Sequence, residues 1–293
     1  MQLVHTFSIV AYDPGKKEWG AAVQSKFLAA AAVVSWAEAN AGAVATQSFA
    51  NVTYGRRGLD LMAAGTAADE VLDILIKDDP DRDLRQVGVV DRSGKAAAFT
   101  GKDCHDWAGH IVGEGFSCQG NILVPGTIEA MAECFQRERK GDGELADWLV
   151  AALAAGQQAG GDQRGRQAAG VLVVREKGGY GGDNDRYLDL RVDDHSSPIE
   201  KLADLVQSHH LFFGEVDPAD LISLQDHSRE IREVLILAGE NEIDPQGPFT
   251  DRIRKSLRSL VGKENLEERW DGEGEMIDRN VIDYLQKRLS TPK

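Results

Sequence analysis

The order of strand-like and helix-like runs is the feature that most limits what this chain of 293 residues can fold into. Four β-favouring runs come first, followed by two helical runs, several strands, two more helices and two final strands. This order fits neither the βαβ alternation of a parallel sheet nor an all-β fold, but it suits two antiparallel sheets between layers of helices. The sequence therefore predicts an α+β fold, built as a four-layer αββα sandwich.

The first four runs are expected to pair as neighbouring strands. An Asp-Pro-Gly turn at 13–15 separates the runs at 6–12 and 19–27, which is typical of a hairpin. Two further strands are predicted at 29–36 and 41–49. Their many alanines and glycines indicate strands that other layers cover closely.

Helical periodicity and turn signals place the remaining elements of this part of the chain. Helices are predicted at 54–64, 67–77, 127–138 and 145–155. Strand-like runs lie at 85–90, 96–100, 110–119, 169–175 and 187–192. A further helix begins at Pro198, because proline is favoured in the first helical turn.

The composition changes after Gly214. From 218 to the end the sequence predicts helices and turns without strands, with helices at 221–238, 249–261 and 277–289. We therefore expect a first domain at 1–214 and a small helical domain at 215–293. A three-helix unit of this size buries little core, so it should dock on the first domain or on another subunit, as in a homo-oligomer.

Composition excludes several classes of partner. The net charge of −15 disfavours nucleic acids and anionic membranes. The chain lacks an apolar run of roughly 20 residues and a signal peptide, so a cytoplasmic location is expected. The three cysteines, Cys104, Cys118 and Cys134, lack metal-type spacing and are expected to be reduced thiols. No metal or other cofactor is predicted.

Thr6 starts the first strand and is a candidate nucleophile. In N-terminal-nucleophile enzymes the first residue attacks and its free α-amine acts as the base, because the pKa of the amine is near neutral. Thr6 could act in this way only after cleavage between His5 and Thr6. The alternative is that threonine simply starts a strand, which it favours. On the residues alone, the alternative is simpler.

Two further strand ends carry polar candidates. Ser25 and Lys26 end the second strand beside Thr6, where they form either a nucleophile–base pair or a solvated strand end. Gln47 closes the fourth strand and Asn51 follows it. Backbone N–H groups at such a strand-to-helix turn can bind an oxyanion, although ordinary helix capping explains the same residues.

The loop at 160–167 is the most unusual stretch of the chain. Asp162, Arg164, Arg166 and Gln167 follow two glycines and precede a buried strand. Arginine forks favour carboxylates and phosphates, so the loop could hold an anionic substrate group in the functional pocket. An internal Asp162–arginine network is the equal alternative. The Gly-Lys-Ser/Thr ending of a P-loop is missing.

Several motifs together resemble a known family. They lie at 6–11, 20–25, 42–47, 54–55, 119–121, 160–167 and 190–195. This set is similar to the family called domain of unknown function ten-twenty-eight, which is grouped with the N-terminal-nucleophile hydrolases that cleave linear or cyclic amides. Members often begin Met-Thr, whereas five residues precede Thr6 here. The segments 262–269 and 277–278 resemble a peptidoglycan-binding domain often attached to this family.

The resemblance implies a hydrolase of a small amide-containing metabolite. Thr6 would be the nucleophile after leader removal, Ser25 and Lys26 would tune it, and Gln47 or nearby amides would stabilise the oxyanion. Asn51 and the loop residues Asp162, Arg164, Arg166 and Gln167 would bind the substrate. A rival hypothesis is a catalytically silent binding protein with an unprocessed leader in the site. A third is a scaffold that binds a protein or cell-wall fragments, although a cytoplasmic chain has no obvious access to peptidoglycan.

Overall fold

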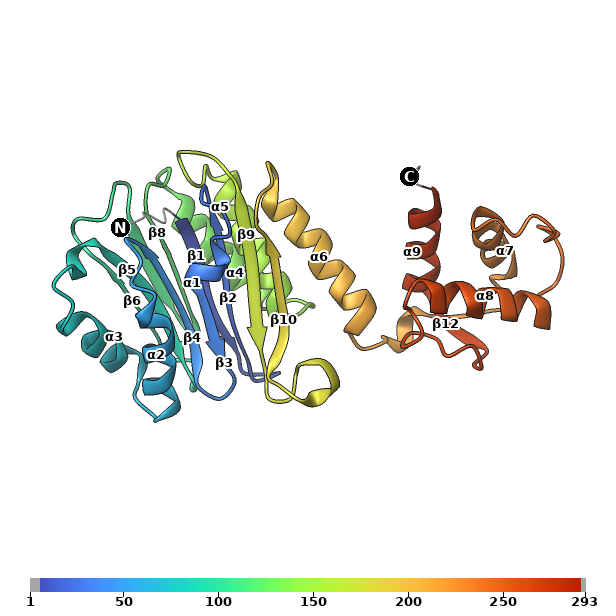
Figure 1. The fold of residues 1–293 in the computed structure, drawn as a ribbon, viewed down its shortest axis with the longest axis horizontal. Helices are drawn as coiled ribbons and strands as arrows, with labels where there is room; N and C mark the ends of the chain where they lie inside the picture. Colours follow the sequence, from blue (N-terminus) through green and yellow to red (C-terminus); the bar gives the residue numbers. More distant parts are fainter. Residues whose placement is uncertain (1–5, 291–293) are drawn as a thin grey trace. The chain divides into compact units, whose positions relative to one another are not determined.

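A computed structural model describes residues 6–290 of the chain (Figure 1). The chain divides into two compact units, Met1–Val206 and Gln207–Lys293. Every strand pair among the described residues is antiparallel, and helices accompany the sheets, so the α+β prediction is confirmed. Within the described part, none of the helices combines the length and the apolar character needed to span a membrane.

The first sheet of the first unit has six strands in the order β10-β9-β2-β1-β8-β7. Its strands are β1 (Thr6–Asp13), β2 (Glu18–Ser25), β7 (Gly109–Gly113), β8 (Phe116–Gly120), β9 (Ala168–Val174) and β10 (Arg186–Val192). The predicted hairpin joins β1 and β2, and in its turn the Asp13 carboxylate accepts a hydrogen bond of 2.8 Å from the Gly15 N–H. The register places Thr6 opposite Ser25.

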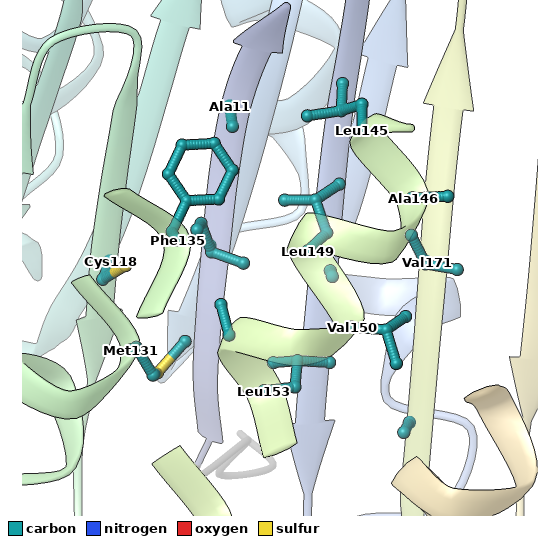
Figure 2. Close-up of a cluster of buried hydrophobic side chains, with 14 of the residues drawn as sticks. Ala11, Cys118, Met131, Phe135, Leu145, Ala146, Leu149, Val150, Leu153 and Val171 are labelled. Atoms are coloured by element: carbon teal, nitrogen blue, oxygen red, sulfur yellow. The ribbon is translucent and has the colours of Figure 1, made fainter. Parts of the chain in front are cut away.

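Helices α4 (Thr127–Glu138) and α5 (Leu145–Gln158) pack on one face of this sheet. Alternate residues of β1, beginning with Phe7, point into the core that the helices cover. Figure 2 shows this core, with Leu149 and Leu153 of α5 over the strands. A Cβ at Gly20 would come within 2.6 Å of the Leu149 side chain, so a larger residue here would force Leu149 to shift. The first half of α6 (Pro198–Phe213) joins the same core.

The second sheet has four strands in the order β3-β4-β5-β6. They are β3 (Ser35–Glu38), β4 (Gly42–Ser48), β5 (Arg85–Asp91) and β6 (Ala96–Thr100). Helices α2 (Thr53–Ala63) and α3 (Ala68–Lys77) pack on one of its faces, as Figure 1 shows, through a core that includes Met62, Leu75 and Val87. Short 3₁₀ turns lie at Arg82–Leu84 and Tyr180–Gly182.

The two sheets face each other through a separate apolar cluster. Val10 and Val23 from the six-stranded sheet belong to it, as do Ala43, Ala45 and Val90 from the four-stranded sheet. The small side chains of β4 allow the sheets to approach closely, as the alanine-rich sequence indicated.

The segment predicted as a strand at 29–36 differs from the prediction. It forms a one-turn helix, α1 (Ala31–Val34), and β3 begins only at Ser35. The reason is that a short alanine-rich apolar run suits a buried helical turn as well as a strand. The single run predicted at 110–119 is also divided, because Gly115 adopts a positive φ of 76° and turns the chain between β7 and β8.

The second unit contains α7 (Ser228–Leu237), α8 (Asp251–Lys263) and α9 (Arg279–Ser290) around its own apolar core. The prediction that it lacks strands was wrong. After a 3₁₀ turn at Pro218–Asp220, β11 (Leu221–Ser223) pairs with β12 (Met276–Asp278). Strands of three residues are too short to produce a readable alternation. Arg269 adds a buried ion pair of 2.9 Å with Asp278.

Candidate active site

The candidate site begins with two of the predicted residues, Thr6 and Ser25. The β1–β2 register brings them side by side, and Thr6 Oγ1 donates a hydrogen bond of 3.1 Å to Ser25 Oγ. Both side chains are fully buried in the chain as it stands. The five residues whose removal would free the Thr6 amine lie outside the described residues.

A layer of buried polar side chains separates the sheets next to Thr6. We call it the inter-sheet polar cluster, and it consists of Ser8, Gln47, Gln86, Ser117, Gln119 and Asn121, all fully buried. Ser117 Oγ donates to Gln119 Oε1 at 2.9 Å, and Gln119 Nε2 donates to Ser8 Oγ at 2.7 Å. Ser8 Oγ in turn donates to Gln47 Oε1 at 2.6 Å. Burial of these groups is tolerated because they satisfy one another.

Gln47 connects this cluster to Thr6. Its Nε2 donates to Gln86 Oε1 at 2.8 Å and lies 3.2 Å from the Gln119 carbonyl oxygen and 3.4 Å from the Thr6 carbonyl oxygen. The two N–H groups of Nε2 therefore already have acceptors inside the protein. In this arrangement Gln47 braces β1 against β4 and does not present a spare donor to an oxyanion.

Gly88 makes room for the inter-sheet polar cluster. A Cβ at this position of β5 would lie 2.0 Å from Gln119 Oε1 and 2.6 Å from Ser117 Oγ. A Cβ atom cannot approach other atoms so closely, so any substitution here would displace the buried Gln119 amide. The inter-sheet polar cluster therefore requires glycine at position 88.

Asp162 fastens the loop at 160–167 to the end of β2. Its Oδ2 accepts from the Lys26 backbone N–H at 3.1 Å and from Arg164 Nη2 at 2.6 Å, and its Oδ1 accepts from Arg164 Nε at 3.0 Å. The Asp162 side chain is fully buried, whereas that of Arg164 is 33% exposed. This geometry supports the internal network, because both Asp162 oxygens hold the Arg164 guanidinium.

The rest of the loop adjoins Ser25 through its backbone. The Gln167 N–H donates to the Ser25 carbonyl oxygen at 3.0 Å, and Gln167 Nε2 donates to Asp194 at 3.1 Å. Arg166 forms an exposed ion pair of 3.0 Å with Glu200, and its carbonyl oxygen accepts from Lys26 Nζ at 3.3 Å. The loop thus lies next to the Thr6–Ser25 pair, as expected from its position before β9.

Asn51 belongs to a different network. Its Nδ2 donates to Asp79 Oδ2 at 3.0 Å, and its Oδ1 accepts from the N–H and hydroxyl of Thr53 at the start of α2. Asp79 also forms a buried ion pair of 3.0 Å with Arg85. Burial alone would raise the pKa of Asp79, but hydrogen bonds from Arg85, Asn51 and Tyr54 hold it well below its usual range. The structure therefore gives the Asn51 amide a structural role at the helix start.

Three residues other than glycine have positive φ angles at or just after the ends of strands β2, β4 and β8. Ala29 after β2, Ser48 at the end of β4 and Ile122 after β8 have positive φ angles of 53°, 64° and 54°. Such angles are unfavourable for residues other than glycine, and most of all for a β-branched residue such as Ile122. Backbone strain of this kind concentrates at functional sites. Lys17, Asn40 and Lys177 have similar angles in the hairpin turns at the other end of the sheets, so only the β-branched Ile122 distinguishes the end beside Thr6.

Sequence reasoning missed Gln86 and Ser117. The available signal was a period of two, because polar or small residues alternate with apolar ones in β5 and β8. That pattern equally describes a strand with one face in water. Among residues 6–290, no group of three or more His, Cys, Asp or Glu side chains could hold a metal ion. The absence of a metal requirement stays a prediction.

These features define an α+β protein whose candidate site lies at one end of two facing antiparallel sheets. The chain belongs to the family of unknown function DUF1028, whose sequence model matches residues 6–202. A second model, described as "Putative peptidoglycan binding domain", matches residues 211–285. A crystal structure of a DUF1028 protein from Silicibacter pomeroyi is 30% identical, with a TM-score of 0.63 over 74% of this chain and 89% of that chain. No curated protein matches the sequence.

Proposed function

We propose that the first unit is an N-terminal-nucleophile-type hydrolase of a small amide-containing metabolite, with its layers arranged as an αββα sandwich. The observation that carries the proposal is the 3.1 Å hydrogen bond between the Thr6 and Ser25 hydroxyls at the start of β1. The family match also begins at Thr6. Both observations support Thr6 as the proposed nucleophile.

In the proposed reaction, cleavage between His5 and Thr6 frees the α-amine of Thr6. Thr6 Oγ attacks the carbonyl carbon of the substrate amide while its proton passes to that amine. The amine product leaves with this proton, and water hydrolyses the ester on Thr6 to release the acid and restore the hydroxyl. Ser25 orients the Thr6 hydroxyl, and Asp162 holds Lys26 at the strand end. Arg166 is the remaining candidate for an anionic substrate group.

The rival proposal is a silent binding protein on the same scaffold. It is supported by the complete burial of Thr6 and Ser25 in the full-length chain, because a buried hydroxyl cannot reach a substrate. Both proposals hold if the chain has no hydrolase activity until it is cleaved before Thr6. The second unit would then act as a separate binding module, with cell-wall fragments as a candidate ligand on the strength of its family match.

Intact mass and N-terminal sequencing of purified protein test the proposal. We expect a fraction of chains to begin at Thr6, and Thr6→Ala to abolish this cleavage because the attacking hydroxyl is gone. Thr53→Ala, an exposed threonine replaced in the same way, should cleave normally. Active protein that consists only of chains beginning at Met1 would exclude Thr6 as an amine-activated nucleophile and would leave Ser8 and Ser25 as candidates.

A further inference from the structure

Gln86 is a fully buried residue of β5 that connects the two sheets. Its Oε1 accepts from Gln47 Nε2 at 2.8 Å and from Asn121 Nδ2 at 2.9 Å. Its Nε2 donates to the Gly120 carbonyl oxygen at 2.8 Å and to Thr100 Oγ1 at 3.0 Å, with the Gly109 carbonyl oxygen at 3.2 Å. Gln86 thus uses the full hydrogen-bonding capacity of its amide.

The two donors to Gln86 Oε1 come from the residues that hold Thr6. The Asn121 backbone N–H donates to the Thr6 carbonyl oxygen at 3.0 Å, and Gln47 Nε2 lies 3.4 Å from the same oxygen. Gln86 therefore bonds directly to the Gln47 amide group that lies beside the Thr6 carbonyl oxygen, and it fixes the side chain of Asn121, whose backbone N–H donates to the same oxygen. No other residue of the inter-sheet polar cluster is bonded to both Gln47 and Asn121 among the described contacts.

The orientation of the Gln86 amide is determined by its surroundings. Its oxygen faces two N–H donors and its nitrogen faces acceptors, so a flipped amide would place oxygen against the carbonyls and nitrogen against the donors. A buried network that is satisfied in only one orientation is rigid and holds its members in a single arrangement.

Gln24 shows that burial alone does not produce such a network. It is also a fully buried glutamine on a strand of this unit, yet neither its Oε1 nor its Nε2 has a hydrogen-bond partner within the part of the chain that the structure describes. The two glutamines therefore differ in their bonding and not in their burial, which makes Gln24 a matched control.

We infer that Gln86 is a positioning residue, which holds Thr6 in place for reaction by aligning Gln47 and Asn121. This inference rests on the proposed function, since it gives Gln86 its purpose. Gln86 touches neither the Thr6 hydroxyl nor a substrate in this arrangement, and it acts only through its two partners.

The test replaces each glutamine by methionine in the full-length protein, because methionine keeps the volume and removes the amide. Hydrogen–deuterium exchange then measures protection of the backbone amides in residues 6–13 and 119–123. In Gln86→Met we expect protection of the Asn121 amide to fall roughly tenfold or more, as several buried hydrogen bonds are lost. Gln24→Met should leave it unchanged, and the fraction of chains cleaved at Thr6 should fall only in Gln86→Met.

Gln86→Glu adds a pH profile that a merely space-filling residue would not show. A protonated glutamic acid can donate one hydrogen bond in place of the amide, and burial raises the pKa of such a carboxyl. Protection in Gln86→Glu should therefore be partly retained at low pH and be lost as pH rises through that pKa. This variant also keeps the test decisive if Gln86→Met does not fold.

The inference would be overturned if Gln86→Met and Gln24→Met lowered protection of the Asn121 amide equally. It would also be overturned if Gln86→Met left this protection unchanged. Protection that does not depend on pH in Gln86→Glu would overturn it as well. Absence of cleavage and of activity in the wild type would instead refute the proposed hydrolase, and the exchange comparison would still decide whether Gln86 positions Thr6.

Discussion

The two ends of the β1–β2 hairpin differ sharply on the face that looks toward the second sheet. At the Thr6 end this face carries Thr6, Ser8 and Ser25, all buried and hydrogen-bonded. At the opposite end the same strands carry Val10 and Trp19 within an apolar cluster. The change occurs within two residues of β1, so neither the strand nor its burial explains it.

The difference teaches what each end contributes. Apolar burial stabilises by about 25 cal/mol per Å², whereas a buried polar group costs free energy unless it is fully bonded. The polar end therefore adds little to the free energy of unfolding, although many of its side chains are ordered. It also carries Ile122, a β-branched residue with a positive φ of 54°. We interpret the apolar end as the source of stability and the polar end as the part retained for its geometry.

Trp19→Ala should produce the largest effect and tests the apolar end. Trp19 is 2% exposed, stacks on Tyr12 with ring centroids 5.0 Å apart and donates to the Asp91 carbonyl oxygen at 3.1 Å. Truncation of such a side chain costs about 3–5 kcal/mol of unfolding free energy. Chemical denaturation measures this loss, while the folded fraction should still be cleaved at Thr6 to the wild-type extent.

Trp19→Phe is the control for this prediction, since it keeps most of the packing and removes the indole N–H. It should cost about 1–2 kcal/mol. If Trp19→Ala lost under about 1 kcal/mol, far below the cost of ordinary core truncations, the apolar end would not be the source of stability.

An intermediate effect is expected from Arg164→Ala, which sharpens the comparison at the polar end. Asp162 is fully buried and would keep only its backbone N–H donors, so we expect a loss of about 1–2 kcal/mol in unfolding free energy. Arg166→Ala is the matched control, because its exposed ion pair with Glu200 contributes no more than about 0.5 kcal/mol. Thermal and chemical denaturation of both variants measure the difference.

Equal stabilities of the two arginine variants would contradict the structural role of the Asp162–Arg164 pair. A ligand that binds wild-type protein should lose affinity in Arg166→Ala without any loss of stability. If affinity instead fell only in Arg164→Ala at unchanged stability, the sequence-based hypothesis of an Arg164 anion site would replace ours.

The β1–β2 hairpin was readable from the sequence because its signal is local. The Asp-Pro-Gly turn and the alternation on either side of it specify the pairing, and the pairing alone places Thr6 beside Ser25. The loop at 160–167 was placed next to them by its position before a buried strand. These parts of the site depend on neighbours in sequence or on a single strand end.

Gln86 could not be recognised in the same way, because the two residues that donate to its Oε1 are 35 and 39 positions away along the chain. A glutamine in the run Arg85–Val90 equally indicates a strand with one face in water, and only the six-stranded sheet packed against it shows that this face is covered. The one-turn helix α1 was missed for a related reason. Its alanines suit either secondary structure, and the tertiary packing decides between them.

The smallest effect concerns Glu18, a buried carboxylate at the end of β2 far from Ser25. Its Oε1 accepts from Arg175 Nη1 at 2.8 Å, whereas its Oε2 has no partner among residues 6–290. Burial raises the pKa of Glu18 above its ordinary value of 4.5, and the Arg175 charge offsets this only in part. The folded state therefore binds the Glu18 proton more tightly than the unfolded state. The stabilisation that this proton gives is present below the ordinary pKa and is lost as pH rises through the raised pKa.

Glu18→Gln removes this titration. Urea denaturation between the ordinary and the raised pKa should therefore show the variant gaining stability relative to the wild type as pH rises, with a constant difference at higher pH. Glu176→Gln, at an exposed position, should follow the wild type throughout, and parallel curves for Glu18→Gln and the wild type would mean that the carboxylate is as well solvated folded as unfolded.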